Sequence, residues 1–242
     1  MITAKQYWDT KKTCDHRYSP DEFFKSKAEE SLLIIQNETD GEVENGVFAD
    51  LGCGTGELLN ALADKIKITH ATDFSKSVLE VAKTSIGSKK IELIHANALE
   101  IASELKNSAW ISTGACNQYM DQSEVEMLID EFSGNLYAKE LYLFDTIDFI
   151  RYFTLGLGVG YQDRGRDKLT AISNLRSKFN CLLNIIYFGM LEKDFYTFPS
   201  MVMGYGYMPR YWSKLCQKKG LSVNFYSSLY YEYRYHVVIK KI

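Results

Sequence analysis

Residues 48–56 carry the spacing in this chain that points most clearly to chemistry. Asp50 is followed by glycines at positions 52, 54 and 56, so the segment reads Asp-x-Gly-x-Gly-x-Gly. Dinucleotide-binding turns instead read Gly-x-Gly-x-x-Gly and place a pyrophosphate on a helix N-terminus. An acidic side chain just before the glycines would repel a phosphate, whereas it suits a ligand that carries an ammonium group. The glycines would let the backbone approach that ligand closely.

This apolar strand and its turn resemble motif I of the class I S-adenosylmethionine (SAM)-dependent methyltransferases. The resemblance is most specific at residues 50–56 and extends, through the order of elements, from about residue 47 to the C-terminus. It implies SAM as cofactor, S-adenosylhomocysteine as product, and no metal. It also implies an α/β fold with a Rossmann-like seven-stranded, mostly parallel sheet, an antiparallel last strand, helices on both faces and an inserted substrate cap. The alternative is a glycine-rich turn in another doubly wound protein.

The resemblance assigns cofactor contacts to residues at the ends of the predicted strands, where open parallel sheets bind ligands. Asp73 would accept hydrogen bonds from the ribose hydroxyls, unless it only caps a helix. Phe74 would flank the adenine or simply pack. Asn97 stands where the family often has an acid; its amide oxygen can still accept a hydrogen bond, but a helix cap explains it nearly as well. The predicted cofactor-binding residues are Asp50, Gly52, Cys53, Gly54, Gly56, Asp73, Phe74, Asn97, Ala98, Gly114 and Arg17.

The segment after the fourth predicted strand, residues 114–119, indicates the kind of methyl acceptor. In the family, enzymes that methylate amino groups of nucleobases or glutamine have Asn or Asp followed by two prolines and an aromatic residue, whereas here Asn117 is followed by Gln118 and Tyr119. The Pro-Cys pair of cytosine C5 enzymes does not occur in the sequence. A small-molecule acceptor remains, more often methylated at oxygen than at nitrogen. A hydroxyl acceptor needs a base to remove its proton.

Three stretches are candidates for the acceptor site. His16 titrates near neutrality and is a candidate base in a predicted lid segment, with a surface histidine as the alternative. Asp145, at the end of the fifth strand, is costly to bury without a role and could act as a base, orient a histidine or cap the next element. Residues 203–210, rich in tyrosine and glycine, are predicted to form a bendable loop that suits a sugar ring or an aromatic acceptor. The predicted catalytic residues are His16, Asn117, Tyr119 and Asp145, and the predicted substrate-binding residues are Tyr18, Tyr205, Tyr207 and Arg210.

The elements that must position these residues follow from the apolar periodicity. Predicted strands and helices alternate from a first helix at residues 19–35 up to residue 146, which predicts a parallel sheet wrapped by helices. The strands are 47–51, 67–73, 91–96, 109–113 and 141–146, and the helices between them are 55–65, 75–86, 99–105 and 121–132. After residue 148 the pattern predicts a helix at 166–179, a hairpin of strands 182–188 and 195–198, a helix at 209–219, and antiparallel strands at 221–226 and 231–241.

These elements divide the chain into four predicted parts. Residues 1–46 form an N-terminal lid and helix, 47–148 the SAM-binding α/β core, 149–207 an inserted substrate cap, and 208–242 a C-terminal helix and antiparallel strand pair that complete the core sheet. The cap is rich in tyrosines, and scattered arginines that could bind phosphates favour a sugar or sugar nucleotide. These arginines are Arg151, Arg164, Arg166 and Arg210.

The composition of the chain limits which binding partners, metal sites and cellular locations are expected. The net charge of −3 disfavours nucleic acid, because proteins that grip phosphates usually have a basic surplus. The five cysteines form no C-x-x-C pair, so a zinc or redox site has no support. No signal peptide and no bilayer-spanning apolar run are evident, so a cytoplasmic protein without a membrane partner is expected. A homodimer is left open.

The sequence thus predicts a SAM-dependent methyltransferase that methylates a small polar metabolite by in-line displacement. A hydroxyl of a sugar or sugar nucleotide is the favoured acceptor. Methylation of a small-molecule amine, of tRNA or of protein remains an alternative. A SAM-binding scaffold that has lost catalysis is an alternative of another class.

Overall fold

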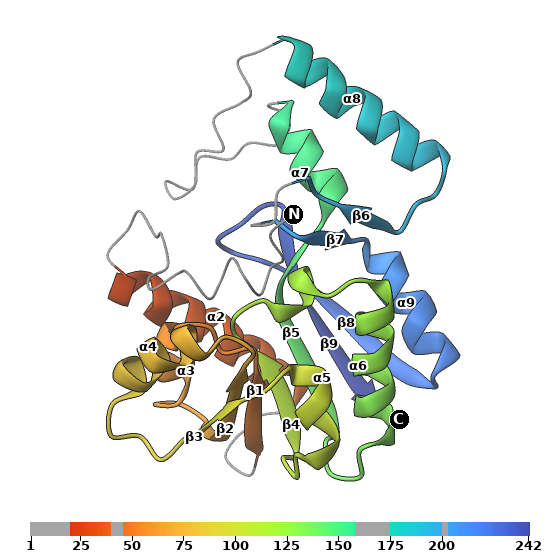
Figure 1. Ribbon diagram of the computed structural model, residues 1–242. Helices are drawn as coiled ribbons and strands as arrows, with labels where there is room; N and C mark the ends of the chain where they lie inside the picture. Colours follow the sequence, from red (N-terminus) through yellow and green to blue (C-terminus); the bar gives the residue numbers. More distant parts are fainter. Residues whose placement is uncertain (1–19, 40–45, 158–174, 200–202) are drawn as a thin grey trace.

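A seven-stranded sheet forms the centre of the protein (Figure 1). The computed structural model describes residues 20–39, 46–157, 175–199 and 203–242. The strand order is β3-β2-β1-β4-β5-β9-β8, and among these strands β9 alone runs antiparallel to its neighbours β5 and β8. The predicted α/β fold is therefore confirmed. The strands are β1 (Val47–Leu51), β2 (Lys67–Asp73), β3 (Glu92–His95), β4 (Ala109–Ser112), β5 (Glu140–Ile147), β8 (Leu221–Ser227) and β9 (Arg234–Lys241).

Helices cover both faces of the sheet. One face is packed by α2, α3 and α4, which contribute Ile35, Leu59 and Ala82 to one core cluster. The other face is packed by α5, α6 and α9, whose apolar side chains surround the buried Trp110. The bounds are α2 (Pro20–Glu38), α3 (Glu57–Leu62), α4 (Lys76–Ile86), α5 (Ala98–Ile101), α6 (Gln122–Gly134) and α9 (Pro209–Lys218), with short 3-10 turns η2 (Ala102–Glu104) and η3 (Cys116–Tyr119).

Local sequence explains where these elements begin. All four residues of β4 are buried, as is typical of a central parallel strand covered by helices on both faces. α4 begins after Ser75, whose hydroxyl accepts a hydrogen bond from the backbone of Val78. α6 begins with a capping box formed by Asp121 and Glu124. The predicted strand–helix alternation up to β5 is confirmed by these elements.

Two predictions after β5 are wrong. Residues 182–188, predicted to be a strand, belong to the helix α8 (Leu175–Met190). The run is apolar except for Asn184, and a short, nearly continuous apolar run cannot be assigned to a helix or a strand by periodicity. The predicted bendable loop at residues 203–210 contains a strand, β7 (Tyr205–Tyr207), which pairs with β6 (Phe195–Thr197) in register Phe195↔Tyr207. Of the predicted helix at 166–179, residues 166–174 lie outside the described residues.

α7 (Phe149–Gly156), α8, β6 and β7 lie beyond the carboxyl ends of β4 and β5 (Figure 1). They share a separate cluster of aromatic side chains, in which Phe149 and Phe153 of α7 contact Phe188 of α8. The hydroxyl of Tyr207 donates a 2.5 Å hydrogen bond to the carbonyl of Met120, just after η3. This segment is therefore fixed above the edge of the sheet at which parallel strands bind ligands.

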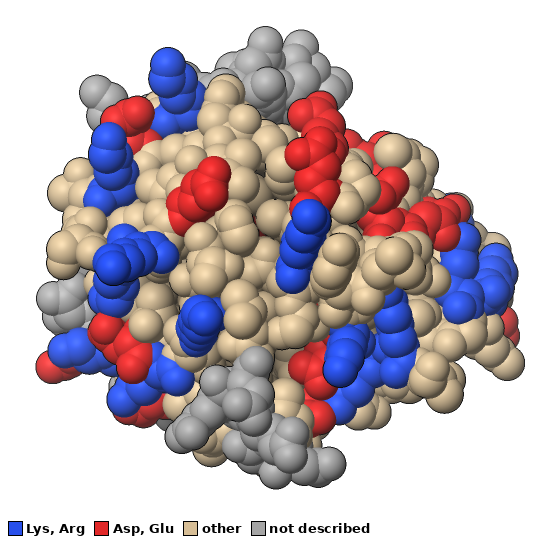
Figure 2. All heavy atoms as spheres, turned by 90° about the horizontal axis from the view of Figure 1, so that it is seen from below, with Lys and Arg blue, Asp and Glu red and all other residues tan. Residues whose placement is uncertain are grey.

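The surface seen from below shows both signs of charge mixed among neutral residues (Figure 2). No broad basic field, which nucleic-acid binding favours, is visible among the described residues on this side. Within the described ranges, no helix combines the length and the apolar content that crossing a membrane requires.

Candidate active site

The glycine turn after β1 adopts a backbone that glycine alone adopts readily. Gly52, Gly54 and Gly56 have φ of +74°, +58° and +82°. A Cβ at Gly52 would lie 2.6 Å from Cβ of Cys116, so this position also needs glycine for space. At Gly54 the nearest atom to an added Cβ is 3.9 Å away, which leaves the turn open on that side. The turn thus leaves room beside Gly54 for a ligand to approach the backbone.

Asp73 connects the end of β2 to this turn. Its Oδ2 accepts a 3.0 Å hydrogen bond from the backbone N–H of Gly54, and its Oδ1 accepts a 2.9 Å bond from that of Ser75. The second bond closes a turn just before α4, whose N-cap is Ser75 rather than Asp73, so the helix cap left open for Asp73 is not its role. The first bond places the carboxylate beside the glycine turn, where it could also reach ribose hydroxyls.

Asp50 is buried and joins the turns that follow β1 and β4. Its Oδ1 accepts a 2.9 Å hydrogen bond from the backbone N–H of Thr113, and its Oδ2 accepts one from the Thr113 hydroxyl. Burial raises the pKa of the Asp50 carboxyl to about 7, the Thr113 hydrogen bonds oppose that rise, and the charge of Asp73 adds to it. Direct contact between Asp50 and an ammonium group stays a prediction.

The Asp50 carboxyl should make stability fall as pH rises. Its folded pKa of about 7 exceeds the unfolded value of about 3.9, so between these values the folded state holds a proton that the unfolded state has lost. The free energy of unfolding should therefore decrease by up to about 1.4 kcal/mol per pH unit in that window. Urea unfolding of wild type and Asp50→Asn at pH 5 and pH 7.5 tests this, since the variant lacks the titration. A difference between the two proteins that does not change with pH would contradict it.

The predicted adenine side contains Phe74, Asn97 and Ala98. Asn97 is the N-cap of α5, and its Oδ1 accepts a 3.1 Å hydrogen bond from the backbone of Leu99. The helix cap that the sequence left open is therefore present, while contact with adenine stays a prediction. His95 lies at the end of β3, with its Nε2 3.1 Å from the carbonyl of Phe74. The turns after β2 and β3 are thus held together at this edge.

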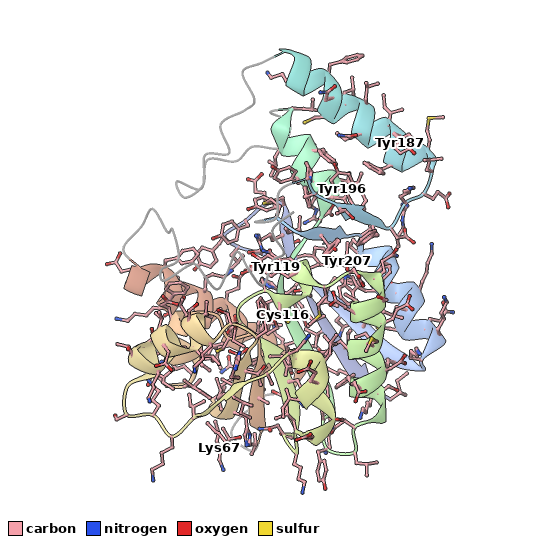
Figure 3. All side chains as sticks on the ribbon, viewed as in Figure 1. Lys67, Cys116, Tyr119, Tyr187, Tyr196 and Tyr207 are labelled. Atoms are coloured by element: carbon pink, nitrogen blue, oxygen red, sulfur yellow. The ribbon has the colours of Figure 1, made fainter. Side chains whose placement is uncertain are left out.

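The turn after β4 packs directly on the glycine turn. The N–H of Gly114 donates a 2.9 Å hydrogen bond to the carbonyl of Gly52, and a Cβ at Gly114 would lie 2.2 Å from that carbonyl oxygen. Cys116 is next to this contact and accepts a 3.1 Å bond from the Ser112 hydroxyl. Burial raises the pKa of the Cys116 thiol to about 12, so it packs as a thiol rather than acting as a nucleophile. Figure 3 shows Cys116 and Tyr119 at the end of the sheet opposite Lys67.

Replacing Gly114 by Ala should separate the two turns. The added methyl group would meet backbone, so we expect a loss of about 1–3 kcal/mol in stability and weaker binding of S-adenosylhomocysteine. Calorimetric titration and thermal melting measure both. The control is Gly134→Ala, at a helical position where an added Cβ would contact nothing within 4 Å. Equal affinities for the two variants would remove the Gly52–Gly114 contact from the cofactor site.

A buried charge cluster surrounds Asp145 near the end of β5. Asp145 has a φ of +60°, unusual for a residue other than glycine, where the β5–β9 register shifts. Bulges of this kind often re-aim a side chain next to an active site. Its carboxylate pairs with Lys27 of α2, its carbonyl accepts a 2.7 Å hydrogen bond from Arg234, and its N–H donates a 3.1 Å bond to Nδ1 of His236. Lys27 is 3% exposed and Asp145 is 8% exposed.

The same cluster reaches the segment after β4. Nη1 of Arg234 also donates a 2.9 Å hydrogen bond to Oε1 of Gln118, and Nδ2 of Asn117 donates a 2.7 Å bond to the hydroxyl of Thr146. Several buried polar atoms of this cluster have no hydrogen-bond partner among the described residues. They include Oδ1 of Asp145, Oδ1 of Asn117 and Nε of Arg234, besides Oε2 of Glu30 and Nε2 of His236.

The charge state of Asp145 limits what it can do. Burial alone would raise its pKa, but Lys27, His236 and Arg234 together lower the pKa to about 2. The carboxylate is therefore ionised at neutral pH and is a poor proton acceptor for catalysis, since a general base works best with a pKa near the working pH. It remains a strong hydrogen-bond acceptor. Of the roles left open by the sequence, orientation of a neighbouring group fits this state best.

Lys27, Glu30 and Arg234 were not singled out by the sequence, and Gln118 was noted only as part of residues 114–119. A signal for the first two was available, because Phe23, Lys27, Glu30 and Ile34 recur at helical spacing on one face of α2, and all four are buried. Charged residues on a buried helical face call for partners. Oε1 of Glu30 lies 3.1 Å from Nε2 of His236.

The remaining candidate residues belong neither to the glycine turn nor to the Asp145 cluster, or they lie outside the described residues. His16, Arg17 and Tyr18 lie outside them, so their predicted roles stay predictions. Tyr205 is half-buried and stacks on Phe195 with ring centroids 5.4 Å apart, whereas Tyr207 is fully buried. Arg210 of α9 pairs with Asp194, which directly precedes β6. These contacts are structural, and a substrate role for the three residues stays a prediction.

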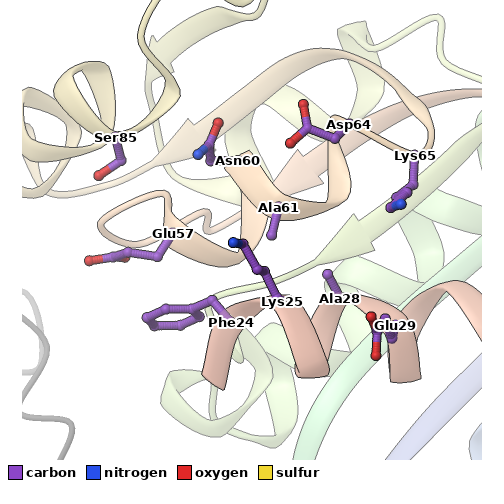
Figure 4. Close-up of a pocket in the computed structure, with 10 residues that line it drawn as sticks. All are labelled: Phe24, Lys25, Ala28, Glu29, Glu57, Asn60, Ala61, Asp64, Lys65 and Ser85. Atoms are coloured by element: carbon purple, nitrogen blue, oxygen red, sulfur yellow. The ribbon is translucent and has the colours of Figure 1, made fainter. Parts of the chain in front are cut away.

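A cavity of about 530 Å³ lies away from all these strand ends. It opens between α2 and α3 and extends to α4, and it is lined by Phe24, Lys25, Glu57, Asp64 and Ser85 among others (Figure 4). Glu57, which directly follows the glycine turn, lines it, but residues 50–56 and the Asp145 cluster do not. Its lining mixes both charges without a convergent set of polar atoms, so it is not the candidate site.

Comparison with known proteins bears directly on the glycine turn. The family model described as "Methyltransferase domain" matches residues 48–137, which run from β1 to just before β5. Over these residues the chain matches a methyltransferase domain, in agreement with the resemblance of the glycine turn to the class I methyltransferases. These residues contain most of the predicted cofactor-binding residues, and this domain type uses SAM as its methyl donor. Among the described residues, no group of three His, Cys, Asp or Glu side chains has the arrangement of a metal site.

Solved structures share the fold at low sequence identity. Magnesium protoporphyrin IX methyltransferase (ChlM) from Synechocystis PCC 6803, with bound S-adenosylhomocysteine, has a TM-score of 0.56 at 15% identity, covering 99% of this chain and 93% of its own. The plantazolicin methyltransferase BpumL has a TM-score of 0.56 at 12% identity, covering 99% and 89%. The methyltransferase domain of bacterial CtHen1-C has a TM-score of 0.51 at 15% identity, covering 90% and 97%. No curated protein sequence matches the chain significantly.

Proposed function

We propose that the protein transfers a methyl group from SAM to a hydroxyl of a small polar metabolite, with a sugar or sugar nucleotide as the first candidate. The open backbone at Gly54 and the carboxylate of Asp73 beside it fit the amino acid and ribose parts of SAM. In this proposal Asp50, Gly52, Cys53, Gly56, Phe74, Asn97, Ala98, Gly114 and Arg17 complete the cofactor site. The bound cofactor supplies an electrophilic methyl group on a sulfonium.

The acceptor end of the proposal rests on the unpaired atoms of the Asp145 cluster. Buried polar groups without partners are rare, and each costs about 1–3 kcal/mol. Oδ1 of Asp145 and Oδ1 of Asn117 need hydrogen-bond donors, whereas Nε of Arg234 needs an acceptor. A hydroxyl group both donates and accepts, so neighbouring hydroxyls on one molecule could satisfy all three. The observation that carries this step is the ionised, strained Asp145 with one oxygen unpaired.

In this proposal each residue around the acceptor has a separate role. Asp145 and Asn117 would orient the acceptor hydroxyls, and Arg234 would hold both Gln118 and the backbone of Asp145 in place. As the carbon–sulfur bond breaks and the carbon–oxygen bond forms, the hydroxyl proton must pass to a base. Because Asp145 is too acidic for this, His16 is the proposed base. Residues 149–207 would form a cap over the acceptor. The acceptor would contact Tyr119 and Tyr205.

Methyl transfer from radiolabelled SAM tests the proposal. Purified protein is incubated with free hexoses, with nucleoside diphosphate sugars, and with the matching amino sugars as a separate arm. Label in the hydroxyl sugars, lost in Gly114→Ala, is the expected result. Label that appears only in the amino sugars would change the proposed acceptor from a hydroxyl to an amine. Tight binding of SAM with no transfer to any arm would favour a scaffold without catalysis.

A further inference from the structure

An exposed apolar stripe runs along α8. Its members are large apolar side chains, each at least 44% exposed, in an element that otherwise packs on α7. They are Phe179 (58%), Leu182 (44%), Leu183 (47%), Ile186 (48%), Tyr187 (53%), Met190 (79%) and the adjoining Leu191 (50%). α8 lies at the end of the molecule farthest from β1 to β4 (Figure 1), and Tyr187 is labelled on it in Figure 3.

The spacing of the stripe is that of a helix that packs against another helix. Phe179, Leu183, Ile186 and Met190 follow one another at intervals of four, three and four residues, the spacing of a coiled-coil seam. The opposite side of α8 is already used, since Cys181 and Phe188 are buried in the aromatic cluster with α7. The helix is therefore apolar on two sides, one of which has no cover among the described residues.

The stripe is large enough for a stable interface. Aromatic side chains present about 150–250 Å² each and aliphatic ones somewhat less, so these half-exposed residues offer on the order of 700 Å². The largest apolar patch on a typical monomer covers about 300–600 Å². Two such stripes placed face to face would bury about 1,400 Å² in total, which is within the roughly 1,200–2,000 Å² of stable protein–protein interfaces.

We infer that the stripe on α8 binds the same stripe of a second copy of this chain, with the two helices antiparallel about a twofold axis. A twofold contact brings one surface against itself, and residues 179–191 contain no charged side chain that would meet its own copy. Leu183 and Ile186 lie near the middle of the stripe and would face each other across the axis. A lipid surface fits less well, because helices that lie on membranes carry Lys and Arg along a polar face. In α8 the basic residues, Arg176 and Lys178, are confined to the first turn, and none occurs from residue 179 to 191. This inference does not depend on the proposed reaction.

Sedimentation equilibrium of the full chain over a concentration series tests the inference. The wild type should have twice the mass of one chain, and Leu183→Glu and Ile186→Glu should each shift it to the mass of a single chain. Leu33→Glu is the matched control, because Leu33 is 56% exposed on α2, away from the stripe, and should leave the dimer unchanged. Circular dichroism melting of each variant shows whether the fold is kept.

Two results would overturn the inference. One is a wild type that stays at the mass of a single chain throughout the series. The other is a folded stripe variant that remains as dimeric as Leu33→Glu. If the wild type is monomeric, it is mixed with vesicles of phosphatidylcholine and phosphatidylglycerol. Wild type that floats with the vesicles, while Ile186→Glu does not, would show that the stripe binds a lipid surface instead.

Discussion

Replacing Lys27 by Met is expected to lower the free energy of unfolding by about 3–5 kcal/mol, the usual cost of removing one partner of a buried ion pair. Lys27 and Asp145 are almost completely buried, and removing the ammonium would leave the carboxylate without its nearest positive charge. The methionine keeps a similar volume, so packing should change little. Urea unfolding followed by circular dichroism measures the loss.

Two further variants make this prediction specific. Lys214→Met removes an ion pair with Asp194 in which the lysine side chain is 61% exposed, and it should cost less than about 1 kcal/mol. Lys27→Met combined with Asp145→Asn should recover part of the loss, because no unpaired charge remains and Asn tolerates a positive φ. If Lys27→Met costs no more than Lys214→Met, the buried pair does not hold α2 to β5.

The pH dependence of this pair has a defined sign. The pKa of Asp145 is lowered to about 2 in the folded state, from an unfolded value near 3.9. Its stabilising contribution is therefore complete above about pH 4 and is lost as pH falls toward 2. This window is separate from that of Asp50, which acts between about pH 4 and 7.

Replacing Asp73 by Ala is expected to weaken S-adenosylhomocysteine binding about 10–150-fold, equivalent to about 1.5–3 kcal/mol for hydrogen bonds to a charged group. The variant loses the predicted contacts to the ribose and the observed hydrogen bond to Gly54. Isothermal titration calorimetry measures the dissociation constant. Asp130→Ala, which removes an exposed carboxylate paired with Lys219, is the control and should leave the affinity unchanged.

A cofactor analogue without ribose hydroxyls separates the two contributions of Asp73. Wild type should bind this analogue more weakly than S-adenosylhomocysteine, and Asp73→Ala should reduce its affinity by a smaller factor. The same factor for both ligands would mean that Asp73 acts only by holding the glycine turn and the Ser75 backbone.

The glycine turn and its neighbours, where the cofactor is predicted to bind, could be predicted from the sequence because their signals are local. The glycines after β1 mark a backbone with positive φ, and a parallel sheet places the residue after each strand at one edge. Asp73 and Gly114 therefore lie beside the glycine turn, as their positions in the pattern predicted. The Asp145 cluster could not be predicted this way, since Lys27 and Asp145 meet across 118 residues of sequence.

The sequence by itself determined the alternation of strands and helices, the single antiparallel strand, the glycine turn and the methyltransferase class, because periodicity and backbone preference act over a few residues. Tertiary structure decided that Asp50 bonds to Thr113, that α8 is a helix and that Lys27, Arg234 and His236 converge on Asp145. Burial and charge pairing depend on which segments pack together. A local sequence pattern does not show which distant segments will pack together, because that depends on the whole fold.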